Sequence, residues 1–108
     1  MTGRIASVSE IRAALRQQIA ETTLRGTARD LGMSPTGLRS FADGRDAFDS
    51  TLRRARTWYA RWALEHGREA VAEENALEVL FGPLPESRRD VAIATCRTVI
   101  ETFRVVPP

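Results

Sequence analysis

The sequence predicts an all-α protein, a small helical domain of five to six helices. Apolar residues recur at helical spacing, and no segment shows the sustained alternation of apolar and polar residues that a half-buried strand requires. Capping residues and helix breakers divide the chain, and the strongest breaker is Gly82-Pro83-Leu84-Pro85. The chain has 108 residues, of which 43% are hydrophobic and 28% charged, which is the composition of one soluble globular domain.

The first predicted helix begins at a capping box, Ser7-Val8-Ser9-Glu10, and ends near Glu21. Its apolar stripe consists of residues four apart: Ile11, Leu15 and Ile19. A short second helix is predicted over 24–31. Thr22-Thr23 offers its N-cap, and Gly32 fits the left-handed position that ends many helices.

A third helix is predicted to begin directly after this turn. Ser34 is its expected cap and Pro35 its first residue, and the helix stops near Asp43-Gly44. Leu38 and Phe41 are expected to point inward.

Three longer helices are predicted after the polar loop 44–49. The fourth begins near Ser50 and is closed or kinked at Gly67, and one of its faces is apolar: Ala55, Trp58, Tyr59 and Trp62. These aromatic side chains could stack on nucleobases, but their helical spacing favours a buried cluster. His66 is expected to cap the end of this helix.

The fifth helix is predicted over 68–81 and the sixth over 86–104. One apolar stripe runs along the sixth: Ala92, Cys96, Val99 and Phe103. Cys96 is interpreted as a small core residue.

The basic residues are all arginine and are unevenly distributed. Residues 1–68 contain twelve Arg and seven acidic residues, a net charge of +5, whereas residues 69–108 contain four Arg and seven acidic residues, a net charge of −3. Arginine presents a planar set of donors that suits phosphate and guanine edges. A polyanionic partner is therefore expected at the first part of the chain.

Residues 24–43 meet the geometric needs of a helix-turn-helix. Ala28 is small where two helices cross, and Gly32 supplies the positive φ of the turn. Four apolar residues would close the core: Leu31, Met33, Leu38 and Phe41. The remaining residues face outward and are short or hydrogen-bonding: Ser34, Thr36, Gly37, Arg39 and Ser40.

Residues 27–44 resemble the helix-turn-helix of the Cro/phage-repressor (XRE-like) superfamily, and with the flanking helices the resemblance covers about residues 10–60. The matching positions are Ala28, Gly32, Met33, Ser34, Leu38, Phe41 and Gly44. The resemblance implies a sequence-specific transcriptional regulator that inserts the helix 34–42 into the major groove of double-stranded DNA. It implies that base edges are approached by Ser34, Thr36, Arg39 and Ser40. Gly37 departs from the family's pattern, because it removes a side chain at a position that often contacts bases, but it could permit a close approach of the backbone to the DNA.

Arg39 is the best candidate for a bidentate contact with guanine, and a solvated surface arginine is the alternative. The resemblance also places Thr23, Arg25 and the loop Gly44-Arg45 near phosphates. Arg53 and Arg54, near the start of the fourth helix, are further candidates for phosphate contacts, although a solvated basic face is an equal alternative.

Two regions of one compact domain are expected: 1–67 as the helix-turn-helix DNA-binding region and 68–108 as a C-terminal helical hairpin. The hairpin carries apolar residues on more than one side, so it either completes the core or forms a homodimer. A homodimer through the C-terminal helices is expected because one recognition helix buries little surface. The alternatives are a protein-interaction module, such as an antitoxin or adaptor, and a small TetR-like regulator that responds to a ligand.

No enzyme, metal site or cofactor is expected. One cysteine and one histidine cannot form a zinc site, and neither a phosphate-binding glycine loop nor a nucleophile elbow occurs. The run of Glu69, Glu73, Glu74 and Glu78 is expected to be a solvated face. The single cysteine, together with the lack of a membrane-spanning or signal-like apolar stretch, predicts a cytoplasmic protein.

Overall fold

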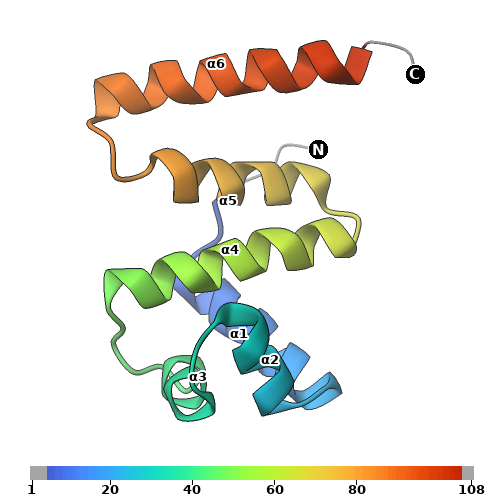
Figure 1. Cartoon of the computed structure of the whole chain (residues 1–108), viewed down its shortest axis with the longest axis vertical. Coiled ribbons are helices and arrows are strands. Elements are labelled where there is room, and N and C mark those ends of the chain that lie inside the picture. Colours follow the sequence, from blue (N-terminus) through green and yellow to red (C-terminus); the bar gives the residue numbers. More distant parts are fainter. Residues whose placement is uncertain (1–4, 106–108) are drawn as a thin grey trace.

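The computed structural model describes residues 5–105, and side chains up to residue 103. Six helices and no strand occur in this part of the chain, so the predicted all-α fold class is confirmed. The helices are α1 (Val8–Glu21), α2 (Leu24–Leu31), α3 (Pro35–Ala42), α4 (Asp49–Glu65), α5 (Glu69–Phe81) and α6 (Glu86–Val105). In Figure 1 the three short N-terminal helices lie below the long α4, and α5 and α6 are stacked above it.

The first three helices begin at side-chain caps, as the sequence predicts. Ser7 Oγ accepts a hydrogen bond from the Glu10 amide at 3.2 Å, and Thr23 Oγ1 accepts one from Gly26 at 3.0 Å. Each cap satisfies an amide that has no partner within its own helix. These starts depend on residues three apart, which is why they can be predicted from short stretches of sequence.

The core is formed where α4 crosses the N-terminal helices. Its buried side chains come from all helices except α6: Ala6, Ile11, Ala14, Leu15, Ala28, Leu31, Leu38, Phe41, Ala55, Trp58, Tyr59, Trp62, Ala63 and Ala72. The rings of Trp58 and Tyr59 both stack on Trp62, with centroids 6.1 Å and 5.5 Å apart. The predicted aromatic cluster is therefore buried in the protein and is not an exposed platform for nucleobases.

The end of α4 also agrees with the prediction. His66 is the C-cap, and its Nδ1 lies 2.7 Å from the Trp62 carbonyl oxygen. Gly67 follows in the left-handed conformation, with φ of 74°. The chain then reverses so that α5 packs along α4.

α5 and α6 differ in how they join the rest of the molecule. α5 supplies the buried Ala72, Asn75 and Leu77, whereas none of the α6 side chains that the structure describes is fully buried. Of the described elements, only α5 packs closely against α6. Cys96 is half-buried, so its interpretation as a close-packed core residue is wrong, because α6 stands away from α4 and α5 along that side.

A buried polar cluster, not predicted from the sequence, joins the N-terminal segment to α4 and α5. The fully buried Asn75 Oδ1 accepts hydrogen bonds from the Ala6 amide at 3.0 Å and from Arg56 Nη1 at 2.8 Å. Asn75 Nδ2 donates to the Val71 carbonyl, and Arg56 Nη1 also donates to the Ala6 carbonyl, both at 2.8 Å. Every polar atom of Asn75 is thus paired, as burial requires.

Replacing Gly32 with alanine is expected to lower the free energy of unfolding by about 1–2 kcal/mol, because a Cβ disfavours its left-handed backbone. Gly32 has φ of 72°, and an added Cβ would lie 3.2 Å from Arg54 Nη1. Gly67→Ala is the matched control, since its φ is 74° but nothing lies within 4 Å of an added Cβ. Urea unfolding of both variants separates backbone strain, which they share, from crowding by Arg54. If the free energy of unfolding of Gly32→Ala is unchanged, the backbone of the turn has shifted to a conformation that alanine adopts without strain.

Candidate nucleic-acid interface

The eight residues of α3 divide into a buried side and an exposed side. Leu38, Phe41 and Ala42 are buried against α1 and α2, the only described elements that pack on α3. The exposed side carries four of the residues predicted to contact bases: Thr36 and Arg39 are exposed, and Gly37 and Ser40 are partly exposed. The fifth, Ser34, is exposed at the N-terminal end of the helix, where it is the cap. We name these five residues the α3 edge.

The start of the α3 edge is shaped by its cap. Ser34 Oγ accepts a hydrogen bond from the Gly37 amide at 3.0 Å, and a Cβ added at Gly37 would lie 3.0 Å from the same oxygen. Gly26 has the same relation to its cap Thr23, at 2.9 Å. Glycine at the third residue of each helix therefore leaves room for the cap. At Gly37 it also leaves the α3 backbone accessible at the centre of the edge.

Two arginines of α1, not predicted as functional residues from the sequence, hold the other end of α3. Arg12 donates from Nε to the Phe41 carbonyl and from Nη2 to the Arg45 carbonyl, both at 2.8 Å. Arg16 Nη1 donates to the Ala42 carbonyl at 2.6 Å.

These bonds satisfy carbonyls at and just after the C-terminal end of α3, and the positive charges interact favourably with that end of the helix. The guanidinium of Arg12 also lies 4.8 Å from the centre of the Phe41 ring. Arg12 and Arg16 lie four residues apart beside the apolar stripe of α1, and this spacing is the signal that could have identified them.

The predicted phosphate-contact residues lie at three places around the helix-turn-helix. Thr23 and Arg25 are exposed at the start of α2, and Arg45 is exposed in the loop after α3. Arg53 and Arg54 are exposed in the first two turns of α4. Arg54 Nη1 also donates to the Gly32 carbonyl, so its guanidinium is held against the turn between α2 and α3. Such a contact leaves other guanidinium donors available.

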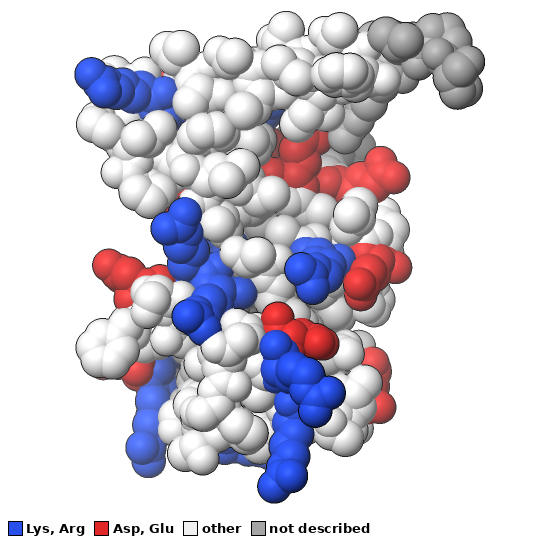
Figure 2. Space-filling model, viewed as in Figure 1, with Lys and Arg blue, Asp and Glu red and all other residues white. Residues whose placement is uncertain are grey.

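The charge distribution agrees with the uneven sequence. Figure 2 shows arginines gathered over the half of the molecule formed by α1–α4, whereas the part formed by α5 and α6 is mostly uncharged on this face, with acidic residues beside it. The α3 edge itself offers hydroxyl, guanidinium and backbone groups. Those groups can hydrogen-bond to base edges and phosphates, and none of them is a carboxylate that would repel a polyanion.

Comparison with protein-family models, with curated proteins and with solved structures found no match. Among the described residues, no helix is long and apolar enough to cross a membrane. The same part of the chain contains no group of three or more His, Cys, Asp or Glu side chains that could hold a metal ion.

Proposed function

We propose that this chain is a non-enzymatic, sequence-specific DNA-binding transcriptional regulator of the Cro/phage-repressor (XRE-like) type. It inserts α3 into the major groove of double-stranded DNA and acts as a homodimer through its C-terminal helices. The observation that carries the proposal is the α3 edge: a capped helix, fixed on its buried side, whose polar side no later described helix covers. Major-groove readers present a helix in this way.

In this proposal each exposed group has a distinct role. Arg39 reads a guanine through two parallel hydrogen bonds, and the hydroxyl side chains Ser34, Thr36 and Ser40 contact neighbouring base edges. Gly37 lets the helix backbone approach the floor of the groove. Contacts with phosphates come from Thr23, Arg25, Arg45, Arg53 and Arg54, and they fix the position of α3 without reading sequence.

A protein-interaction module is the second candidate. The acidic residues of α5 favour it, because they form a surface that repels DNA and could attract a basic protein. Electrophoretic retardation of a random DNA duplex at low salt separates the two candidates. A regulator retards the duplex, and an adaptor does not. Selection from a random duplex library then reveals the binding site, and a palindromic winner would indicate a symmetric dimer.

Binding to duplex DNA is expected to weaken steeply with salt, because arginines that contact phosphates release counterions. Arg53→Ala is expected to weaken binding to all sequences alike and to reduce the slope of log K against log salt by about 0.9, the value for one lost phosphate contact. Fluorescence anisotropy over a salt series measures both quantities. Arg68→Ala, an exposed arginine between α4 and α5 that belongs neither to the candidate DNA site nor to the C-terminal hairpin surface, is the matched control and should change neither. An unchanged slope for Arg53→Ala would remove Arg53 from the interface.

A further inference from the structure

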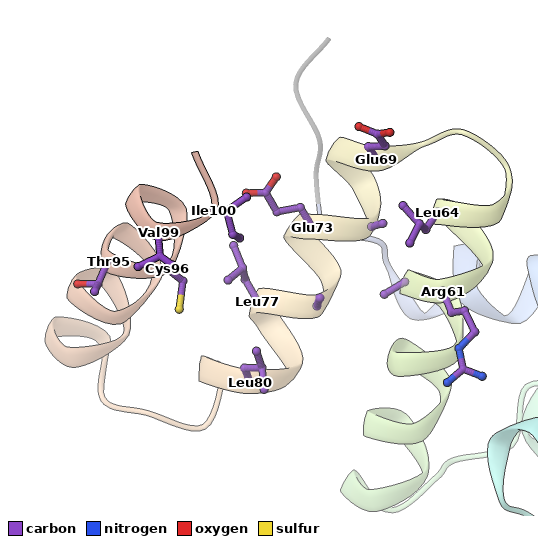
Figure 3. Close-up of a pocket in the computed structure, with 13 residues that line it drawn as sticks. Arg61, Leu64, Glu69, Glu73, Leu77, Leu80, Thr95, Cys96, Val99 and Ile100 are labelled. Carbon is purple, nitrogen blue, oxygen red and sulfur yellow. The ribbon is translucent and has the colours of Figure 1, made fainter. Parts of the chain in front are cut away.

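The side of α6 that faces α4 and α5 borders an apolar cavity of about 690 Å³. The side chains around it in Figure 3 come from all three helices, with Leu64 on α4, Leu77 and Leu80 on α5, and Val99 and Ile100 on α6. Leu64, Leu80 and Val99 are each at least half exposed. Phe103 follows Val99 by one helical turn on the same side of α6 and is 76% exposed. We name this surface the α5–α6 face.

An exposed surface of this kind is unfavourable in an isolated chain. Apolar area in contact with water costs about 25 cal/mol per Å² relative to burial, and large contiguous patches on soluble proteins mark interaction sites. α4 and α5 pack along their length, whereas α5 and α6 meet at few points. The described contacts that hold α6 include an ion pair between Arg97 and Glu74. The α5–α6 face is therefore incompletely buried within one chain.

The size of the molecule indicates how much surface remains to be covered. Its radius of gyration is 15.1 Å, whereas a compact domain of this length has about 13 Å. Its accessible surface is 7396 Å², whereas a folded monomer of 12.0 kDa exposes about 6,000 Å². The excess is about 1,400 Å² per chain. A stable protein–protein interface buries about 800 Å² per partner, so this excess, which is summed over all 108 residues, is large enough to include one.

The charges around the face are complementary to a second copy of the same chain. α5 carries four glutamates and no arginine, whereas the described part of α6 carries three arginines, Arg88, Arg89 and Arg97, together with three acidic residues, Glu86, Asp90 and Glu101. Within one chain, the ion pair between Arg97 and Glu74 already joins an arginine of α6 to a glutamate of α5. In a two-fold arrangement, α6 of each copy can face α5 of the other, which places arginines opposite glutamates at both related contacts.

We propose that a second copy of this chain covers the α5–α6 face, so that the two α5–α6 hairpins pack about a two-fold axis and bury Leu64, Leu80, Val99 and Phe103. The inference deepens the homodimer part of the proposed function and rests on it. Figure 1 shows α6 at the opposite end of the molecule from α3, so this pairing leaves both α3 edges exposed. A two-fold dimer with two exposed recognition helices fits a palindromic pair of half-sites.

The oligomeric state, measured without DNA, tests the inference. Sedimentation equilibrium of the full chain at micromolar concentration is expected to give twice the 12.0 kDa chain mass. Val99→Asp and Phe103→Asp are each expected to raise the dimer dissociation constant about a hundredfold or more, because a charge is then buried at the centre of the interface. Both side chains are at least half exposed in the single chain, so the variants should keep their helical circular dichroism. Phe48→Asp is the matched control. Phe48 is 85% exposed and lies before α4, so this variant should remain dimeric.

Other outcomes overturn the inference. They are a monomeric wild-type chain, or dimers that persist in both variants. Saturable binding of one apolar dye molecule to a monomer would show that the cavity holds a small molecule instead.

If the variants do not fold, the thiol of Cys96 in the wild-type chain gives a second measurement, since Cys96 lines the cavity. Its rate of reaction with a thiol reagent should rise on dilution below the dissociation constant. A rate independent of concentration contradicts pairing at this face. Because neither measurement contains DNA, a failure here is distinct from a failure to retard DNA.

Discussion

Replacing Asn75 with leucine is expected to lower the free energy of unfolding by about 2–3 kcal/mol, even though leucine has a similar volume and is more apolar. The leucine side chain cannot accept the hydrogen bonds from the Ala6 amide and from Arg56 Nη1. The Ala6 amide would lose its acceptor at a buried position, and the partly buried Arg56 would keep only its bond to the Ala6 carbonyl. The cost of a buried, unsatisfied amide and of a weakened charged hydrogen bond exceeds the gain from burying a more apolar group.

Thermal and urea unfolding, followed by circular dichroism, measure this loss. Asn75→Asp is the informative comparison, because its carboxylate still accepts from Arg56 and from the Ala6 amide, while its second oxygen faces the Val71 carbonyl to which Asn75 Nδ2 donates. Its loss of stability should be smaller than that of Asn75→Leu. If the free energy of unfolding of Asn75→Leu lies within about 0.5 kcal/mol of the wild-type value, the hydrogen bonds of Asn75 to the N-terminal segment do not stabilise the fold.

Replacing Arg39 with alanine is expected to weaken binding to the preferred duplex by about 1–3 kcal/mol and to relax the preference at one base pair. Arg39 is the only charged side chain on the α3 edge, and its helix is held at the C-terminal end by Arg12 and Arg16. A guanidinium can form two parallel hydrogen bonds with a guanine, and its planar set of donors loses less side-chain entropy per hydrogen bond than an ammonium group does.

The measurement compares the variant and the wild type on the selected site and on sets of duplexes in which one base pair at a time is varied through all four possibilities. Loss confined to one position supports a base contact. An equal loss on every duplex would assign Arg39 to a phosphate, and no loss would leave it a solvated residue. Arg29→Ala, an exposed arginine near the end of α2 and outside the candidate site, is the matched control and should preserve sequence preference.

The helices and the α3 edge could be predicted because they depend on local signals. Ser34 caps α3 through an amide only three residues away, that of Gly37. Gly32 adopts the left-handed conformation that ends a helix, which glycine favours because it has no Cβ. Apolar spacing then determines that Leu38 and Phe41 are buried, and hence that Thr36 and Arg39 are exposed. Each of these conclusions needs only a few neighbouring residues.

The interactions that position the edge could not be predicted in the same way. The pair Ala6 and Asn75 is separated by 69 residues, and the pair Arg12 and Phe41 by 29. Such pairs are fixed by how helices cross, which local patterns do not encode. Arg54 shows the difference most clearly, since its sequence position suits a phosphate contact and a solvated basic face equally, while the crossing of α4 brings it to the Gly32 carbonyl.

The position of α6 could be predicted only in part. The sequence contains more apolar residues than one face needs, and Val99 and Phe103 are indeed exposed in the single chain. The expectation that Cys96 is a core residue assumed that the helix closes onto its neighbours. Hydrophobic spacing identifies the apolar side of a helix, but it does not show whether that side is buried by other helices of the same chain or by a second chain.

The contact between Arg54 and the Gly32 carbonyl also means that a movement of α4 is transmitted to the turn between α2 and α3. With 17 residues, α4 is about 25 Å long, and one end is fastened to the turn while the other reaches the α5–α6 face. A tilt of about 5° at the far end would displace the turn by about 2 Å, which is a large fraction of the spacing between adjacent base pairs. In the proposed dimer, the tilt of α4 would therefore change the distance between the two α3 helices, and with it the separation of half-sites that fits.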